Sequence, residues 1–150
     1  MKAANLRIVL LAVWMVAAVL TIPLSIAVKL LGKSGGWLVI VVLFYGLFIV
    51  GIWIALGLLP LLIRREFPSK LAWAWAGLVM TFIGFAVFYS NMPDFGDYGP
   101  VSVPAWWFGN EKAAVVTACV GLGISVVGHL LWIGSCLFYA VRSRSKPEAL

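Results

Sequence analysis

Charged side chains are scarce in this sequence, and acidic ones are the scarcest. Of its 150 residues, 11% are charged and only five are Asp or Glu. By contrast 64% are hydrophobic, whereas the apolar share of a soluble domain is about half. So little charge leaves no room for a sizeable aqueous domain. The composition therefore predicts a single integral membrane domain over residues 1–150.

Histidine and cysteine are almost absent, which argues against several classes of membrane enzyme. One histidine cannot supply the paired axial ligands of a diheme cytochrome. Cys119 and Cys136 are 17 positions apart on one expected helix, or roughly 25 Å along its axis, so they cannot pair within one chain. Without a Cys-x-x-Cys motif, a thiol-disulfide enzyme is not indicated. We accordingly expect no catalytic residue, no metal site and no cofactor.

Four long apolar runs are present instead, each long enough to cross the roughly 30 Å hydrocarbon core of a bilayer as a helix. The predicted fold is an all-α integral membrane protein with four transmembrane helices in an antiparallel bundle. An alternative interpretation of the first run is a secretory signal cleaved after Ala27, but the run is long for a signal. The predicted spans are residues 8–28, 37–63, 71–90 and 113–141.

The basic residues predict which side of the membrane each loop faces. With four spans, the two termini and the loop 64–70 share one side and carry eight Lys and Arg, against three on the other side. The positive-inside rule then places both termini in the cytoplasm, in the plasma (inner) membrane. The net charge of +6 follows from this topology, because basic residues on the cytoplasmic side are attracted to anionic lipids of the inner leaflet. No nucleic-acid partner is expected, because the basic residues sit at helix ends and form no single recognition surface.

The longest stretch between spans, residues 91–112, is an outer loop rich in aromatic side chains. Its three prolines and three glycines prevent a continuous helix. We expect it to lie along the membrane surface, with its tryptophan pair among the headgroups. A Ca²⁺ site at its two aspartates is not favoured, because that ion needs six or more oxygen ligands. A surface for an outer partner is the better hypothesis, and its candidate residues are Asp94, Asp97, Tyr98, Trp106 and Trp107.

Small residues recur at every seventh position along the fourth run, which follows a suitable helix N-cap, Asn110. Small side chains let helix backbones approach closely, so this side of the helix predicts a packing seam. Its partner is either another helix of the same chain or a second subunit, and the pattern does not decide between them. The predicted seam residues are Ala114, Gly121, Ser125, Gly128 and Ser135.

The fourth run also carries the only histidine, His129, two residues from its midpoint. An ionisable group at that depth must face protein or water. Ser125 at i−4 and Cys136 at i+7 share its face of the helix. The three residues could form a polar or pathway site, or His129 could be a neutral, hydrogen-bonded packing residue. No Asp, Glu or second His lies inside any span to extend a proton relay, which favours packing.

These features lead to two functional hypotheses. The first is a non-catalytic protein that acts by assembly: a homo-oligomer, an accessory subunit of a membrane complex, or an envelope sensor or immunity-type protein. The second is a small channel or carrier whose pathway is lined by Ser125, His129 and Cys136. An enzyme would need an acid, base or nucleophile in a constellation that is missing here. Besides the lipid bilayer, we expect self-association or another membrane protein as partner.

Overall fold

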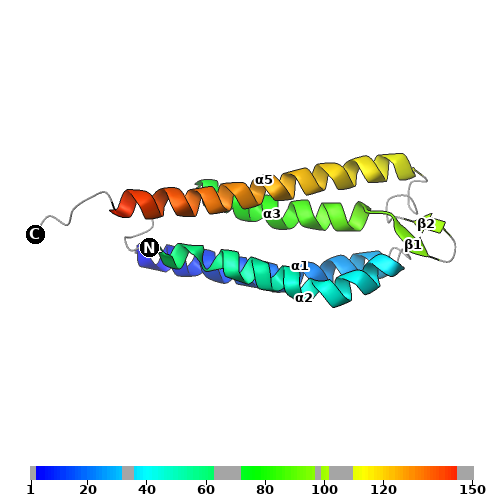
Figure 1. Cartoon of the computed structure of the whole chain (residues 1–150), viewed down its shortest axis with the longest axis horizontal. Coiled ribbons are helices and arrows are strands. Elements are labelled where there is room, and N and C mark those ends of the chain that lie inside the picture. Colours follow the sequence, from blue (N-terminus) through cyan, green and yellow to red (C-terminus); the bar gives the residue numbers. More distant parts are fainter. Residues whose placement is uncertain (1–2, 32–35, 63–71, 97–98, 102–109, 145–150) are drawn as a thin grey trace, which may run out of the picture.

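Four long helices dominate the computed structural model, which describes residues 3–31, 36–62, 72–96, 99–101 and 110–144 (Figure 1). All four are long and apolar enough to cross a membrane, which confirms that part of the sequence prediction and indicates a membrane protein. The long helices are α1 (Ala3–Leu31), α2 (Trp37–Gly57), α3 (Ala72–Asn91) and α5 (Glu111–Arg144). The short elements are the 3₁₀ turn η1 (Leu59–Leu62) and the strands β1 (Asp94–Gly96) and β2 (Gly99–Val101).

The second apolar run does not form one helix over the whole of residues 37–63. Instead α2 ends at Gly57, and the chain continues in the 3₁₀ turn η1. Pro60 accounts for the break, because it has no backbone N–H to donate to the carbonyl of Leu56 and its ring crowds the preceding turn. The run is therefore divided into a helix and a turn, which the apolar pattern alone does not reveal.

The outer loop contains a short hairpin that the sequence analysis did not predict. Strands β1 and β2 pair antiparallel, with Asp94 opposite Val101 and Gly96 opposite Gly99. At the end of the loop, the Asn110 side-chain oxygen accepts a hydrogen bond of 3.0 Å from the backbone N–H of Ala113. The predicted N-cap of the fourth helix is thus confirmed.

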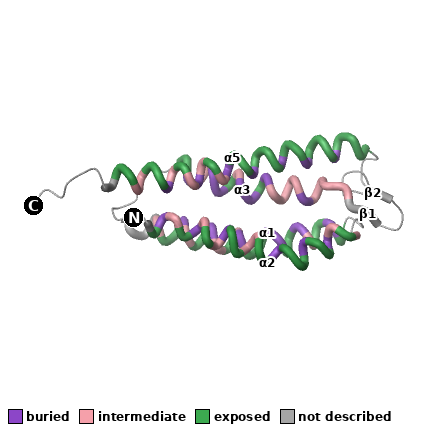
Figure 2. Tube along the Cα trace, in the orientation of Figure 1, coloured by how far each residue is buried: buried purple, intermediate pink, exposed green. Residues whose placement is uncertain are grey.

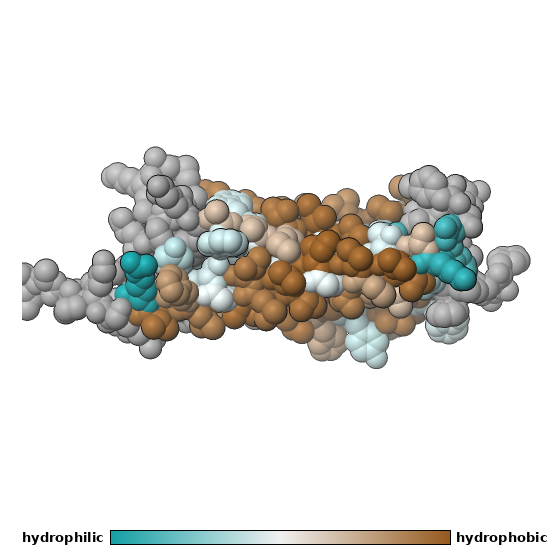
Figure 3. Space-filling model, turned by 90° about the horizontal axis from the view of Figure 1, so that it is seen from above, coloured by the Kyte–Doolittle hydropathy of each residue, from teal (hydrophilic) through white to brown (hydrophobic). Residues whose placement is uncertain are grey.

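The long helices form two layers (Figure 1), one of α1 with α2 and one of α3 with α5. The buried residues lie on the sides of the helices that face other helices, and the exposed ones lie outside (Figure 2). The outer surface is strongly apolar: Leu47 is 79% exposed and Phe44 72%. Hydrophobic residues occupy the middle of the face in Figure 3, while hydrophilic ones gather near its two ends. Such a surface is suited to contact with lipid tails.

Candidate functional site

Helices α3 and α5 touch backbone to backbone at glycines. A Cβ added to Gly84 would lie 2.7 Å from the Gly121 carbonyl oxygen and 2.9 Å from the Ser125 Cα atom. A Cβ added to Gly128 would lie 2.8 Å from the Gly77 carbonyl oxygen. Real Cβ atoms essentially never come that close to another atom, so these positions admit only glycine at this helix separation. Gly84 of α3 thus meets Gly121 of α5, and Gly77 of α3 meets Gly128 of α5.

The structure places the seam predicted for the fourth helix against α3 of the same chain. The central seam residues Gly121, Ser125 and Gly128 are buried there, and the Ser125 hydroxyl donates a hydrogen bond of 2.9 Å to the Thr81 carbonyl. Ala114 is also buried, whereas Ser135 is half-buried. The pattern left open whether the partner is internal or a second subunit. In this chain the middle of the seam is occupied by α3.

Two hydrogen bonds hold His129 in the middle of the bundle and define its tautomer. Its Nδ1 atom is 2.8 Å from the Ser125 carbonyl oxygen, which can only accept, so Nδ1 carries the proton. Its Nε2 atom is 2.9 Å from the indole nitrogen of Trp53, which can only donate, so Nε2 presents its lone pair. Both contacts are satisfied only by a neutral imidazole protonated on Nδ1.

His129 belongs to an aromatic core that joins all four long helices. Trp14 stacks on Trp132 with ring centroids 4.1 Å apart. Phe82 meets Trp14 and Trp53 edge-on, at 4.9 and 5.1 Å. Edge-on and offset-stacked rings are the favoured arrangements of aromatic pairs. The aromatic core consists of Trp14 from α1, Trp53 from α2, Phe82 from α3, and His129 and Trp132 from α5.

Indole N–H groups of the aromatic core bind backbone carbonyls near the end of α2. Trp132 donates to the Leu56 carbonyl at 2.9 Å, and Trp14 donates to the Trp53 carbonyl at 2.5 Å. The helical partner of the Leu56 carbonyl would be the N–H four residues on, but that residue is Pro60 and has none. Trp132 therefore supplies a donor at the point where the proline ends α2.

Sequence reasoning missed Trp14 and Trp53 as members of this site, although a signal was present. Tryptophan normally gathers near the membrane–water interface, yet both residues lie well inside their apolar runs. An indole N–H at that depth needs an acceptor inside the protein. A tryptophan far from the ends of a span therefore indicates a buried polar contact.

The third member of the proposed pathway face, Cys136, is 2% exposed and packs within the hydrophobic core. Ser125 and His129 lie on the same side of α5, and their polar atoms are hydrogen-bonded within the bundle. Among the described residues, no three His, Cys, Asp or Glu side chains come together as a metal site would require. The face is a packed polar contact in this structure.

Lys29, which directly follows the predicted span 8–28, is completely buried near the end of α1. Its ammonium group donates a hydrogen bond of 2.8 Å to the Met92 carbonyl and lies 5.3 Å from the centre of the Tyr89 ring. Tyr89 in turn donates to the Leu38 carbonyl of α2, at 3.3 Å. Lys29 thus helps to fix the ends of α1, α2 and α3 where the outer loop begins.

The candidate outer surface falls mostly outside the described residues. Asp94 begins β1, and the other four candidates, Asp97, Tyr98, Trp106 and Trp107, lie outside that part of the chain.

Comparison with known protein families, curated proteins and solved structures gives no match for this chain.

Proposed function

We propose that the chain is an integral protein of the plasma (inner) membrane that crosses the bilayer four times in alternating directions, with both termini in the cytoplasm. The four apolar helices support the crossings. The eight Lys and Arg on one side, against three on the other, support the orientation.

Reporter fusions test this orientation. Alkaline phosphatase, which is active only outside the cytoplasm, should be active when inserted in the loop 91–112 and inactive when joined after Leu150. Green fluorescent protein joined after Leu150 should fluoresce. As a control, alkaline phosphatase inserted in the loop 64–70 should be inactive. The reverse pattern at all three positions would contradict the proposed orientation.

We further propose that the protein is non-catalytic and acts by assembly with a second copy or another membrane protein. The observation that carries this proposal is that polar groups in the interior are hydrogen-bonded to other protein atoms. Both ring nitrogens of His129 and the hydroxyl of Ser125 are hydrogen-bonded to protein atoms in the interior. A pathway along the Ser125, His129 and Cys136 face would have to break these contacts, so the channel or carrier hypothesis has less support.

The face of α5 opposite the seam is the strongest candidate for the assembly surface. A Cβ added at Gly123 or Gly134 would meet nothing within 4 Å, so a second helix could approach closely there. Leu130, on the same side, is 64% exposed. The free thiol of Cys119 is exposed as well, one turn before Gly123. We call Cys119, Gly123, Leu130 and Gly134 the outer stripe; at 3.6 residues per turn they share one side of the helix.

Oxidative cross-linking in native membranes tests the assembly. If two copies pair through the outer stripe, oxidation should join Cys119 to Cys119 and give a dimer on a non-reducing gel. Cys136→Ser should leave this dimer unchanged, because Cys136 is buried. In a Cys119→Ser background the dimer should disappear, and Leu130→Cys should restore it.

A matched control comes from α2, where Leu47 is 79% exposed and lies away from the stripe. In the Cys119→Ser background, Leu47→Cys should give no dimer. Dimers at Leu47 but at neither stripe position would overturn the assignment of the surface. A single copy by native mass, with no partner recovered from membranes, would overturn assembly itself.

A further inference from the structure

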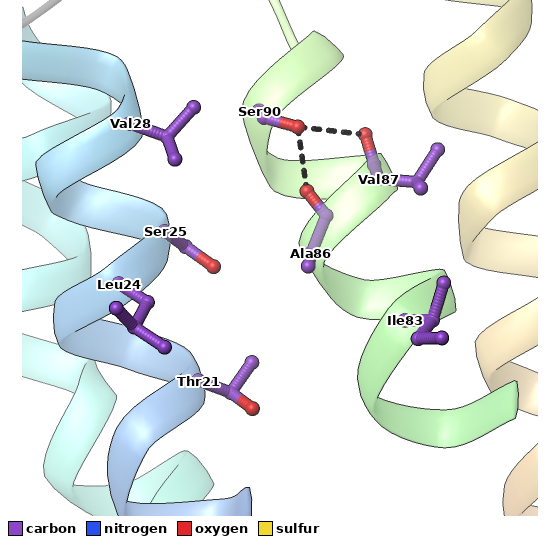
Figure 4. A pocket seen from close by; sticks show the side chains of 8 residues that line it. All are labelled: Thr21, Leu24, Ser25, Val28, Ile83, Ala86, Val87 and Ser90. Carbon is purple, nitrogen blue, oxygen red and sulfur yellow. Dashed lines mark hydrogen bonds between the residues drawn. The ribbon is translucent and has the colours of Figure 1, made fainter. Parts of the chain in front are cut away.

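A groove of about 280 Å³ lies between α1 and α3 (Figure 4). Two residues at its edges are largely exposed, Leu24 at 60% and Ile83 at 58%. Thr21 and Ser25 are buried, at 8% and 4% exposure. The groove therefore has a buried floor and is open on the apolar outer surface. Its lining is Thr21, Leu24, Ser25 and Val28 from α1 and Ile83, Ala86, Val87 and Ser90 from α3.

The Ser25 hydroxyl is the feature that points to a ligand. It has no hydrogen-bond partner among the described residues, and its oxygen points across the groove toward α3 (Figure 4). The other two hydroxyls of the lining are already used within their own helices. Thr21 donates to the Ala17 carbonyl and Ser90 to the Ala86 carbonyl, each at 2.6 Å. An unpaired buried hydroxyl is costly, so Ser25 is poised to bind an acceptor that enters the groove.

The position of Ser25 along α1 narrows the chemistry of that acceptor. Ser25 is one helical turn before Lys29, or about 6 Å along the axis. Lys29 binds Met92, just after the end of α3, and so marks the outer boundary of the bundle. Ser25 therefore lies just inside that boundary. In a bilayer this is the depth at which the ester groups of a phospholipid meet its acyl chains.

The size and lining of the groove fit an acyl chain. A water molecule occupies about 30 Å³ in the liquid, and on that scale the groove has room for roughly nine groups the size of a methylene. The walls around Ser25 are aliphatic, and the open edge would face lipid tails. A transmembrane helix, with a diameter of about 10 Å including side chains, is too wide for this space.

We propose that the groove binds one acyl chain of a phospholipid in the outer leaflet, and that the ester carbonyl of this chain accepts a hydrogen bond from Ser25. The assignment to the outer leaflet rests on the proposed orientation, whereas the binding itself requires only the groove. An inverted orientation in the reporter fusions would move the site to the other leaflet and leave lipid binding intact. Loss of lipid binding would leave the orientation intact.

A comparison of ester-linked and ether-linked lipids tests the proposal. The probes are dioleoyl phosphatidylglycerol and its dialkyl ether analogue, which lacks the ester carbonyls, added to purified protein in detergent and measured by native mass spectrometry. The wild-type protein should bind the ester lipid roughly two- to tenfold more tightly, as expected for one net hydrogen bond. Ser25→Ala should remove this preference. Thr117→Ala is the matched control and should keep it, because the Thr117 hydroxyl lies on α5, outside the groove lining, and is bonded to its own helix.

Variants that fill the groove test the acyl-chain contact independently of the hydrogen bond to Ser25. Ala86→Leu should weaken binding of both lipids, with the helical circular dichroism unchanged. If this variant fails to fold, Leu24→Phe at the exposed edge provides a second way to narrow the groove. Equal binding of the two lipids by the wild type would overturn the role of Ser25. Full binding of both lipids by a folded groove-filling variant would overturn the site.

Discussion

Replacing Gly84 with alanine is expected to lower the free energy of unfolding by about 3 kcal/mol, at the upper end of the usual cost of overpacking. The added Cβ would lie 2.7 Å from the Gly121 carbonyl oxygen and 2.9 Å from the Ser125 Cα atom. Both are backbone atoms, so no side-chain rotation relieves the clash. The helices α3 and α5 would have to separate, which would also stretch the hydrogen bond from Ser125 to the Thr81 carbonyl. Thermal unfolding in detergent, followed by tryptophan fluorescence, measures the loss.

Gly51→Ala is the matched control for this substitution. Gly51 is an exposed helical glycine of α2, and a Cβ added there would meet nothing within 4 Å. The change should not lower the unfolding free energy, because alanine is the better helix former by up to about 1 kcal/mol. A loss at Gly51 as large as the loss at Gly84 would contradict the close contact at Gly84, because the added Cβ meets no atom at Gly51.

Tight packing of glycine against backbone is a reasonable basis for stability in this chain. Lipid tails are as apolar as leucine, so helices in a bilayer gain little from hiding apolar side chains from their surroundings. Close backbone contact and hydrogen bonds between helices must then supply much of the association energy. The contacts of Gly84, Gly121 and Gly128 provide the first, and those of Trp132, Ser125 and His129 provide the second.

The helices of this fold were predictable because each depends on local sequence. Uninterrupted apolar runs give four long helices, and Asn110 has the side chain that an N-cap requires. The end of α2 shows the limit of the apolar pattern. Residues 58–63 are as hydrophobic as the rest of the run, and the break depends on the missing N–H of one residue, Pro60.

The sequence could not predict which helix each face contacts, because periodicity identifies one face of a helix but does not identify its neighbour. The heptad of small residues places Gly121 and Gly128 on one side of α5, yet it could not identify α3 as the helix they contact. His129 was recognised as needing a partner. That partner, Trp53, is 76 positions away in the sequence, and no local rule connects the two. The sequence could not predict the free hydroxyl of Ser25 either, because the absence of a partner depends on the spacing of α1 and α3.

The aromatic core carries the second large expected effect. Trp132→Ala should destabilise the protein by about 3 to 5 kcal/mol, the usual cost of truncating a fully buried tryptophan. The Trp132 side chain is completely buried and stacks on Trp14. Its loss would leave a cavity where α1, α2 and α5 meet. It would also remove the N–H that binds the Leu56 carbonyl.

Two further variants separate these contributions and test the assignment. Trp132→Phe keeps an aromatic ring against Trp14 but has no N–H for Leu56, so it should cost less than the alanine variant while still losing at least the roughly 1 kcal/mol of one hydrogen bond. Trp73→Ala removes a tryptophan that is 67% exposed on α3, and its effect on unfolding in detergent should be within about 0.5 kcal/mol. If Trp73→Ala were as damaging as Trp132→Ala, the position of Trp132 at the centre of the bundle would be wrong. If Trp132→Phe matched wild type, its indole N–H would not be supporting the end of α2.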